Sequence, residues 1–339
     1  MQDGLIILDP WPRSAEQIFD TDQYRRLEAF GPVVSCDSRT EPSTFDSLLP
    51  DAIAILGQPA LDRDRLSRAS NLQVLINVEG NFYPNVDYSA CFAAGITVLS
   101  IAPAFAVSVA EMTIGLALDL ARAITPYDAA IRAGTELYGS RGGGGAMLLS
   151  RSTVGIIGYG GIGRAVRRLL RSFASEILVY DPWLPDGLLH DDDCTPTDLA
   201  TLLATSDFVL VCAAATVENQ QLLGRAELGS LRPGAVLVLV GRADVVDFAA
   251  LIELVNAGHF RAAVDVFPKE PIPIDDPIRQ SKLLLSSHRA GGTRAAMASA
   301  AEMILDDLGL ILRGLPPMRL LPARRETIAS VRSKPAQYR

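Results

Sequence analysis

The sequence of 339 residues is poor in histidine and cysteine and has no excess of positive charge. Its formal net charge of −8 argues against a nucleic-acid partner, because nucleic-acid binding calls for a basic surface. The four cysteines, Cys36, Cys91, Cys194 and Cys212, show neither metal-ligand nor disulfide spacing. We therefore expect them to be reduced and assign them no function.

Long apolar runs and targeting segments are also lacking. No apolar run approaches the roughly 20 residues of a membrane helix, and the N-terminal residues lack the basic start and long apolar core of a signal peptide. We therefore expect a cytoplasmic protein without a membrane partner. With 49% hydrophobic residues, a chain of this length can bury two cores, which predicts about two domains.

Short apolar runs rich in branched residues alternate with longer amphipathic stretches. This alternation predicts an α/β fold, with parallel sheets covered by helices. A long helix is expected over 107–122, the glycine-rich segment 140–146 is expected to be an irregular connection, and the tail after Pro316 is expected to be solvated or loosely docked. The predicted strands are 4–8, 52–56, 72–76, 96–99, 154–157, 177–180, 208–212, 235–240, 262–266 and 283–285.

A glycine-rich turn, T-V-G-I-I-G-Y-G-G-I-G-R-A, occupies 153–165, between a predicted strand and a predicted amphipathic helix over 164–173. Gly158 permits the tight turn, Gly160 lets the backbone approach a pyrophosphate, and Gly163 lets the helix pack closely. The phosphates would then lie at a helix N-terminus. The pattern predicts a dinucleotide site, and a purely steric turn without a ligand is the alternative.

The choice of dinucleotide depends on the next predicted strand, which ends in Asp181. This aspartate follows Gly163 at about the 20-residue offset expected for the acid that binds the adenosine ribose. Its carboxylate would repel the extra phosphate of NADP, which needs an arginine nearby. No Lys or Arg occurs from Ser172 to Gly224, so the sequence favours NAD over NADP.

Only three histidines are available as an acid or base. His190 lies in L-L-H-D-D-D-C, where a metal site is one interpretation and a solvated loop the favoured one. His259 follows Gly258, a predicted helix terminator, which favours a capping or surface role. His288 differs, because it follows a predicted strand, at the edge where open α/β sheets bind their ligands.

Arg242, Glu270 and His288 follow three successive predicted strands, which delivers them to one edge of a sheet. A cation, a carboxylate and an imidazole are what hydride transfer to a carboxylate-bearing substrate requires. Each residue alone is compatible with a solvated loop. The conjunction predicts a catalytic site.

This order of residues resembles that of the D-isomer-specific 2-hydroxyacid dehydrogenase family. The first half of the chain adds N-V-E-G-N-F-Y-P-N-V-D at 77–87, A-A-G-I-T-V at 93–98 and S-V-A-E-M-T at 108–113. These segments are similar to the family's substrate loop, return strand and interdomain helix. The resemblance therefore covers most of the chain.

The resemblance implies two Rossmann/flavodoxin-like doubly wound parallel-sheet domains with a cleft between them. The substrate domain would be discontinuous, 1–106 plus 290–339, and the NAD-binding domain would be 107–289. Helix 107–122 would carry much of the dimer contact, so a homodimer is expected.

The resemblance also implies roles for individual residues. Arg242 would bind the substrate carboxylate, His288 would be the general acid/base, and Glu270 would be its partner. The residues expected to bind the cofactor NAD are Gly158, Gly160, Gly161, Ile162, Gly163, Asp181, Ala213, Gly241 and Asp265, the last through the nicotinamide carboxamide. Those expected to bind substrate, with Arg242, are Glu79, Gly80, Asn81 and Phe82.

The chain departs from the family pattern around these residues. Leu239–Gly241 and Ala243 flank the arginine where other residues are usual, and Ser287 replaces a common proline before the histidine. Phe82 and Phe105 are phenyl rings at positions of smaller or polar residues, which implies a reshaped pocket.

One further departure concerns the substrate. Leu56 stands where branches acting on phosphoglycerate use an arginine, so we expect the chain to resemble those branches poorly.

The sequence thus predicts an oxidoreductase that transfers a hydride between NAD(H) and a small 2-hydroxy or 2-keto acid. Two alternatives remain open. One is an NAD(H)-sensing co-regulator without turnover, because this fold has been reused in that way. The other is a dehydrogenase of a small anion such as formate or phosphite.

Overall fold

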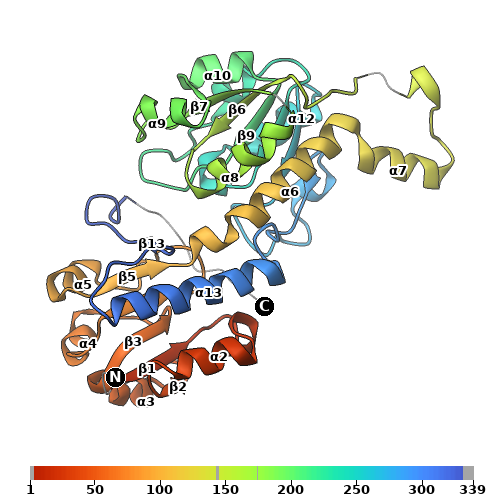
Figure 1. Ribbon diagram of the computed structural model, residues 1–339. Coiled ribbons are helices and arrows are strands. Elements are labelled where there is room, and N and C mark those ends of the chain that lie inside the picture. Colours follow the sequence, from red (N-terminus) through yellow and green to blue (C-terminus); the bar gives the residue numbers. More distant parts are fainter. Residues whose placement is uncertain (1–3, 143–144, 174, 331–339) are drawn as a thin grey trace. The chain divides into compact units, whose positions relative to one another are not determined.

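The computed structural model describes residues 4–142, 145–173 and 175–330 and divides into two compact α/β units (Figure 1). Unit 1 comprises Met1–Ala106 and Gly292–Arg339, and unit 2 comprises Val107–Gly291. The expected boundaries, at residues 106/107 and 289/290, lie close to these divisions. Each unit has its own sheet, which confirms the predicted α/β class with two doubly wound sheets.

Unit 1 is built on a six-stranded sheet of order β13-β5-β4-β3-β1-β2. The first five strands along the chain are parallel, and β13 pairs antiparallel with β5. The strands are β1 (Leu5–Asp9), β2 (Val33–Ser35), β3 (Ala52–Gly57), β4 (Val74–Asn77), β5 (Thr97–Ser100) and β13 (Leu321–Pro322).

Helices cover both faces of this sheet, so successive side chains of β1 enter different cores. Ile6 and Leu8 pack with Ile304 of α13, whereas Ile7 packs with Phe45 of α3 on the other face. The helices of unit 1 are α1 (Ala15–Ile18), α2 (Thr21–Glu28), α3 (Pro42–Leu48), η1 (Leu49–Asp51), α4 (Arg63–Arg68), α5 (Tyr88–Ala94) and α13 (Arg294–Ile311).

Unit 2 is built on a seven-stranded parallel sheet of order β12-β11-β10-β9-β6-β7-β8. Its central strands are buried on both faces, as expected for a parallel sheet with helices on each side. The strands are β6 (Thr153–Ile157), β7 (Glu176–Tyr180), β8 (Thr195–Pro196), β9 (Phe208–Val211), β10 (Val236–Leu239), β11 (Arg261–Val264) and β12 (Leu284–Leu285).

The helices of unit 2 connect these strands in the right order for parallel pairing. They are α6 (Ala102–Arg122), which begins in unit 1, α7 (Ile124–Ala133), η2 (Gly139–Arg141), α8 (Gly161–Leu170), η3 (Arg171–Phe173), α9 (Asp186–Asp191), α10 (Leu199–Thr205), α11 (Arg225–Gly229), η4 (Ala243–Val245), α12 (Phe248–Asn256) and η5 (Pro277–Gln280).

Each sheet has one point where the strand order reverses. In unit 1 the reversal lies between β1 and β3, and in unit 2 it lies between β6 and β9. Open α/β sheets bind ligands outside the carboxyl ends of their strands at such switch points. The topology alone therefore marks two places for ligands, one in each unit.

Every predicted strand is present, whereas the short strands β2, β8 and β13 were missed because none of them lies in a distinct apolar run bounded by turn residues. The predicted irregular connection over 140–146 includes the last residues of the 3-10 turn η2, and residues 143–144 lie outside the described residues. The predicted helix 164–173 corresponds to the end of α8 followed by η3.

Helix α6 corrects two expectations. It begins at Ala102 rather than at residue 107, and it is long and apolar enough, by length and composition, to cross a membrane. The expectation that no segment approaches that length is therefore wrong. Half of its most apolar window, of mean hydropathy 1.6, is nevertheless buried within the structure, as in the core helix of a folded domain.

The tail after Pro316 is docked rather than loose up to residue 330, the last that the structure describes. The buried carboxylate of Asp307 accepts hydrogen bonds from the backbone N–H groups of Met318, Arg319 and Leu320. This turn brings β13 beside β5, and Arg325 donates to the carbonyl of Phe92. Backbone capture by one buried aspartate leaves little trace in the sequence pattern.

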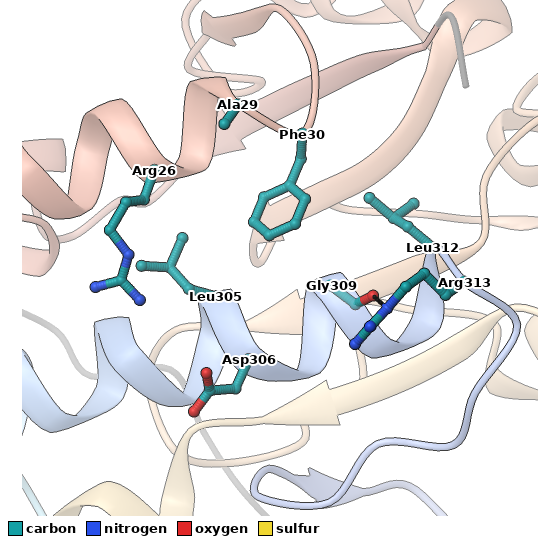
Figure 2. Close-up of a pocket in the computed structure, with 8 residues that line it drawn as sticks. All are labelled: Arg26, Ala29, Phe30, Leu305, Asp306, Gly309, Leu312 and Arg313. Carbon is teal, nitrogen blue, oxygen red and sulfur yellow. Dashed lines mark hydrogen bonds between the residues drawn. The ribbon is translucent and has the colours of Figure 1, made fainter. Parts of the chain in front are cut away.

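A surface groove of about 530 Å³ lies between α2 and α13 of unit 1 (Figure 2). The ring of Phe30 and the side chain of Leu305 point into it. Its charged residues have partners nearby, since Arg26 pairs with Glu302 and Asp306 with Arg319. None of the predicted site residues lines this groove.

Candidate active site

The glycine-rich turn lies at the switch point of unit 2, between β6 and α8. Gly158 has a φ of +86°, and a Cβ there would come within 2.6 Å of the Cα of Ala213. A Cβ at Gly163 would come within 2.5 Å of the carbonyl oxygen of Gly158. Both positions therefore require glycine for packing within the protein.

Gly160 differs, because a Cβ there would meet no heavy atom within 4 Å among the described residues. It is the N-cap residue of α8 and provides no side-chain cap, so the first N–H groups of the helix are open to an anion. Gly161 and Ile162 form the first turn of that helix. Open space beside an uncapped helix N-terminus fits the pyrophosphate of a dinucleotide.

Asp181 follows β7, next to β6. Its carboxylate accepts hydrogen bonds from the backbone N–H of Tyr159 at 2.8 Å and of Trp183 at 3.1 Å. A hollow of about 300 Å³ lies beside it, and its lining includes Tyr180, Asp181, Pro182 and Thr197 but no basic residue. The arrangement fits a ribose without a 2′-phosphate.

Arg242, Glu270 and His288 follow β10, β11 and β12, which are neighbours in the sheet of unit 2. Nδ1 of His288 lies 2.7 Å from Oε2 of Glu270, so the predicted contact between these two side chains is present. Nε2, the other ring nitrogen, is then the atom that can exchange a proton with a substrate.

The carboxylate of Glu270 is held on both oxygens. Oε1 accepts the backbone N–H of Phe267 at 2.9 Å, while Oε2 faces His288. Burial raises the pKa of Glu270, but the hydrogen bond and charge of His288, the N–H of Phe267 and the charge of Arg242 outweigh burial and lower it. Glu270 is therefore an anion at neutral pH.

Asp265 anchors the backbone turn that carries His288. It is buried, its Oδ1 accepts hydrogen bonds from the Ser286 hydroxyl and the N–H of Arg289, and its Oδ2 accepts the N–H of Ala290. His288 itself has a φ of +50°, a conformation that costs a non-glycine residue on the order of 1–3 kcal/mol and persists only where the surrounding structure holds it. Asp265 fixes this turn, a role that the sequence did not reveal.

Arg242 has an extended backbone just before η4, and its Nη1 donates to the carbonyl of Gly241 at 2.7 Å. A Cβ at Gly241 would come within 2.3 Å of the carbonyl oxygen of Ala213. Gly241 and Ala213 therefore bring the ends of β10 and β9 close together. The close approach of Gly241 to Ala213 fixes the backbone next to Arg242.

The predicted substrate loop, Glu79–Phe82, follows β4 of unit 1. Gly80 has a φ of +78°, and a Cβ there would come within 2.8 Å of the ring of Phe105. The ring of Phe82 is buried in the core and packs edge-on against Tyr88. The effect of this ring on the shape of a substrate pocket stays a prediction.

The other two histidines lie apart from these residues in the sequence and the fold. His190 is in the last turn of α9, not in an irregular loop as predicted, and no group of three metal-ligating side chains occurs in the part of the chain that the structure describes. His259 follows α12, and its Nε2 lies 3.2 Å from the carbonyl oxygen of Gly229. That contact agrees with the expected structural role.

Comparison with known proteins decides the family. Residues 114–290, just over half of the chain, match the NAD-binding domain model of the D-isomer specific 2-hydroxyacid dehydrogenases. The chain belongs to this family. Its cofactor is accordingly NAD(H), in agreement with the prediction from Asp181.

Individual relatives bear different names. The chain is 31% identical to a glyoxylate reductase of Thermofilum pendens over 304 residues, covering 84% of this chain and 87% of the relative. It is 30% identical to a D-3-phosphoglycerate dehydrogenase of Archaeoglobus fulgidus over 268 residues, which is 78% of this chain. The chain spans about half the length of that enzyme.

Solved structures show the same fold. A phosphoglycerate oxidoreductase from Rhizobium etli superposes with a TM-score of 0.86 at 42% identity, covering 96% of this chain and 99% of the other. The expectation that phosphoglycerate branches resemble the chain poorly rested in part on Leu56, which the structure places in the core of unit 1. Similarity to proteins with that name is thus closer than this one position suggested.

Proposed function

We propose that the protein is an NAD-dependent D-2-hydroxyacid dehydrogenase that interconverts a small 2-hydroxy acid and the corresponding 2-keto acid. The observation that carries the proposal is the 2.7 Å contact between Glu270 and His288, on strands adjacent to the one that ends at Arg242. A paired imidazole and a cation at the carboxyl edge of the cofactor-binding sheet suit this reaction.

Arg242 binds the substrate carboxylate in this proposal. Its guanidinium can make two parallel hydrogen bonds to a carboxylate and, by its charge, polarise the neighbouring carbonyl. The backbone N–H groups around Asn81 and Phe82 are proposed to bind the other carboxylate oxygen. These contacts orient the keto carbon, which lowers the entropic cost of reaction.

His288 moves the proton. In reduction it enters as the imidazolium and donates the proton on Nε2 to the oxygen that becomes the hydroxyl, and in oxidation it accepts that proton back. Glu270 fixes Nδ1 as the N–H donor. When bound, NADH supplies the hydride to the substrate carbon.

The cofactor would be held by residues on the edge of the same sheet. The turn Gly158–Gly163 and the N-terminus of α8 would bind the pyrophosphate, and Asp181 the adenosine ribose. Ala213, Gly241 and Asp265 follow β9, β10 and β11, the strands that lie between β6 and β12 in the sheet. The nicotinamide is therefore proposed to lie along these three residues.

A panel of 2-keto acids tests the function. Purified protein should oxidise NADH with at least one of glyoxylate, hydroxypyruvate, pyruvate or their analogues, and NADPH should be a much poorer donor. His288→Asn should reduce turnover by about 10²–10⁴-fold, the usual worth of a positioned proton donor, while NADH binding is retained. His259→Asn is the matched control and should keep full activity.

The same panel separates the alternatives. NADH binding without turnover of any keto acid would favour an NAD(H)-sensing co-regulator. NAD reduction with formate or phosphite, and not with 2-hydroxy acids, would favour a dehydrogenase of a small anion. Near-normal turnover in His288→Asn would show that another group moves the proton.

A homodimer is proposed from the surface of unit 2 between α6 and β6. Val107, Ile124, Ile131, Leu137 and Leu148 each have more than half of their surface exposed. Soluble proteins rarely leave such a series of large apolar side chains in water unless they form a contact. A second copy of the chain is the partner that we propose.

A further inference from the structure

The switch point of unit 1 carries an arginine that the catalytic scheme does not use. Arg13 lies in the loop after β1, and Gln58 follows β3, so the two residues flank the place where the strand order reverses. The rule that places ligands at such switch points applies to this sheet as it does to the cofactor sheet. A cation is therefore positioned where a ligand is expected.

Arg13 contacts the predicted substrate loop directly. Its Nε lies 2.6 Å from Oε1 of Glu79, and the side chains of Arg13 and Glu79 are 21% and 6% exposed. The contact is a charge pair without hydrogen-bond alignment, because Nε of Arg13 donates no hydrogen bond within the described chain. The carboxylate thus holds the Nε side of the guanidinium.

The opposite side of the guanidinium has two terminal nitrogens, Nη1 and Nη2. No hydrogen bond or ion pair to either of them is found among residues 4–142, 145–173 and 175–330. An arginine held at Nε presents these two nitrogens as a fork, the geometry that binds a carboxylate or phosphate through two parallel hydrogen bonds.

The loop that carries Arg13 is fixed on both sides. Nε2 of Gln58 donates to the carbonyl oxygen of Trp11 at 2.6 Å, and Oε1 of Gln58 accepts the N–H of Val78 at 3.3 Å. The guanidinium of Arg39 stacks on the ring of Trp11, 3.6 Å from its centroid. Gln58 therefore links the loop after β1 to the residue that follows β4, and holds both in place.

Other charges at this edge are already compensated. Arg39 pairs with Asp37, and the buried carboxyl of Asp9 accepts a hydrogen bond from the hydroxyl of Ser38. Burial raises the pKa of Asp9 despite that hydrogen bond, so its negative charge is disfavoured. Among the described residues of this edge, no hydrogen bond to either terminal nitrogen of the Arg13 guanidinium is found.

We infer that Arg13 determines substrate specificity by binding a second anionic group, a phosphate or carboxylate at the end of the substrate remote from the 2-hydroxy acid. The inference rests on the proposed function, in which the loop Glu79–Phe82 contacts the substrate. Glu79 acts as a positioning residue that orients the guanidinium. The substrate class is then a dianionic 2-hydroxy or 2-keto acid.

Two matched pairs of substrates test this inference. The first pair is hydroxypyruvate and 3-phosphohydroxypyruvate, and the second is pyruvate and oxaloacetate, so that the arms distinguish a phosphate from a carboxylate. Wild-type protein should have a kcat/KM at least tenfold higher for the dianionic member of one pair. Equal or lower values for both dianions would overturn the inference.

Substitution assigns the effect to Arg13. Arg13→Met should reduce kcat/KM for the preferred dianion by roughly 10–100-fold, the range expected for a lost charge-assisted interaction, and change the monoanion by less than about threefold. Arg13→Lys should recover part of the loss, since it keeps the charge without the fork. Equal losses for both members of the pair would mean that Arg13 is only structural.

Arg26→Gln is the control, because Arg26 also belongs to an ion pair of unit 1 but lies in the last turn of α2 and lines the groove of Figure 2. It should leave the preference for the dianion unchanged. A loss of preference in Arg26→Gln, with none in Arg13→Met, would move the anion site to that groove.

Binding without turnover makes the test independent of catalysis. With NAD⁺ present, the preferred dianion should raise the thermal unfolding midpoint of wild-type and Arg26→Gln protein but not of Arg13→Met. If no keto acid is reduced, the proposed function is wrong. The shift of the unfolding midpoint still shows whether Arg13 binds the dianion. If keto acids are reduced with no dependence on Arg13, only the inference fails.

Discussion

At the scale of single residues, the Glu270–His288 contact is the feature on which the proposed chemistry depends most. The lowered pKa of Glu270 keeps its carboxylate charged until the solution is more acidic than the usual range for glutamate. The pair is therefore retained through neutral pH and lost in acid, when Glu270 becomes protonated.

Glu270→Gln should move the pH profile of keto-acid reduction. Glutamine cannot ionise, so the fall in activity that follows protonation of Glu270 in acid should be absent from the variant's profile, while KM at low pH changes little. Steady-state rates measured from acid through neutral pH give the profile. An unshifted profile would show that the 2.7 Å contact has no role in proton transfer.

Arg242 should affect different kinetic constants. Its guanidinium is proposed to bind the carboxylate in both the ground state and the transition state, and to act more strongly as charge develops on the keto oxygen. Arg242→Ala should therefore raise KM and lower kcat together, and Arg242→Lys should restore only part of each. A change in KM alone would mean that Arg242 binds substrate without polarising it.

At the scale of an element, the turn between β6 and α8 contains two kinds of glycine. Some are required for close packing of the protein, and one is proposed to be required for binding the cofactor. A Cβ at Gly163 would strike the carbonyl oxygen of Gly158, whereas a Cβ at Gly160 would meet open space. Gly163→Ala should thus lower the thermal unfolding midpoint. Gly160→Ala should leave it nearly unchanged and weaken NADH binding by at least about tenfold, because a methyl group obstructs the pyrophosphate.

Calorimetry and a fluorescence titration with NADH measure these two effects on the same preparations. Full NADH affinity in Gly160→Ala would contradict the proposed position of the pyrophosphate. An undiminished unfolding midpoint in Gly163→Ala would show that the close approach of α8 to the turn can relax.

At the scale of the whole molecule, the exposed apolar side chains from Val107 to Leu148 should lie in the contact between two copies of the chain. Ile131→Glu combined with Leu137→Glu would place two charges in that contact, so the mass in solution should fall from dimer to monomer. Ile274→Glu is the control, because Ile274 is 93% exposed in a different loop of unit 2. Light scattering coupled to size exclusion measures the mass, and a wild-type monomer would contradict the proposal.

From the amino-acid sequence we could predict the alternation of strands and helices, the glycine-rich turn and the residues that follow the strands. Short branched apolar runs such as Val236–Leu239 favour buried strands, and a strand that is followed by Arg242 places that arginine at the carboxyl edge. Local pattern and chain order are sufficient for such predictions. The two-residue strands β8 and β13 carry no such pattern and were missed.

Contacts between side chains that are distant in the sequence could be seen only in the three-dimensional structure. The anchoring of the His288 turn by Asp265, the burial of the Phe82 ring and the pairing of Arg13 with Glu79 each join residues through the sheet order. The periodicity of a sequence indicates which face of a sheet a residue occupies. Its neighbour on that face depends on which strands lie side by side. That order is fixed by packing of the whole unit, so these contacts could not be derived from the sequence alone.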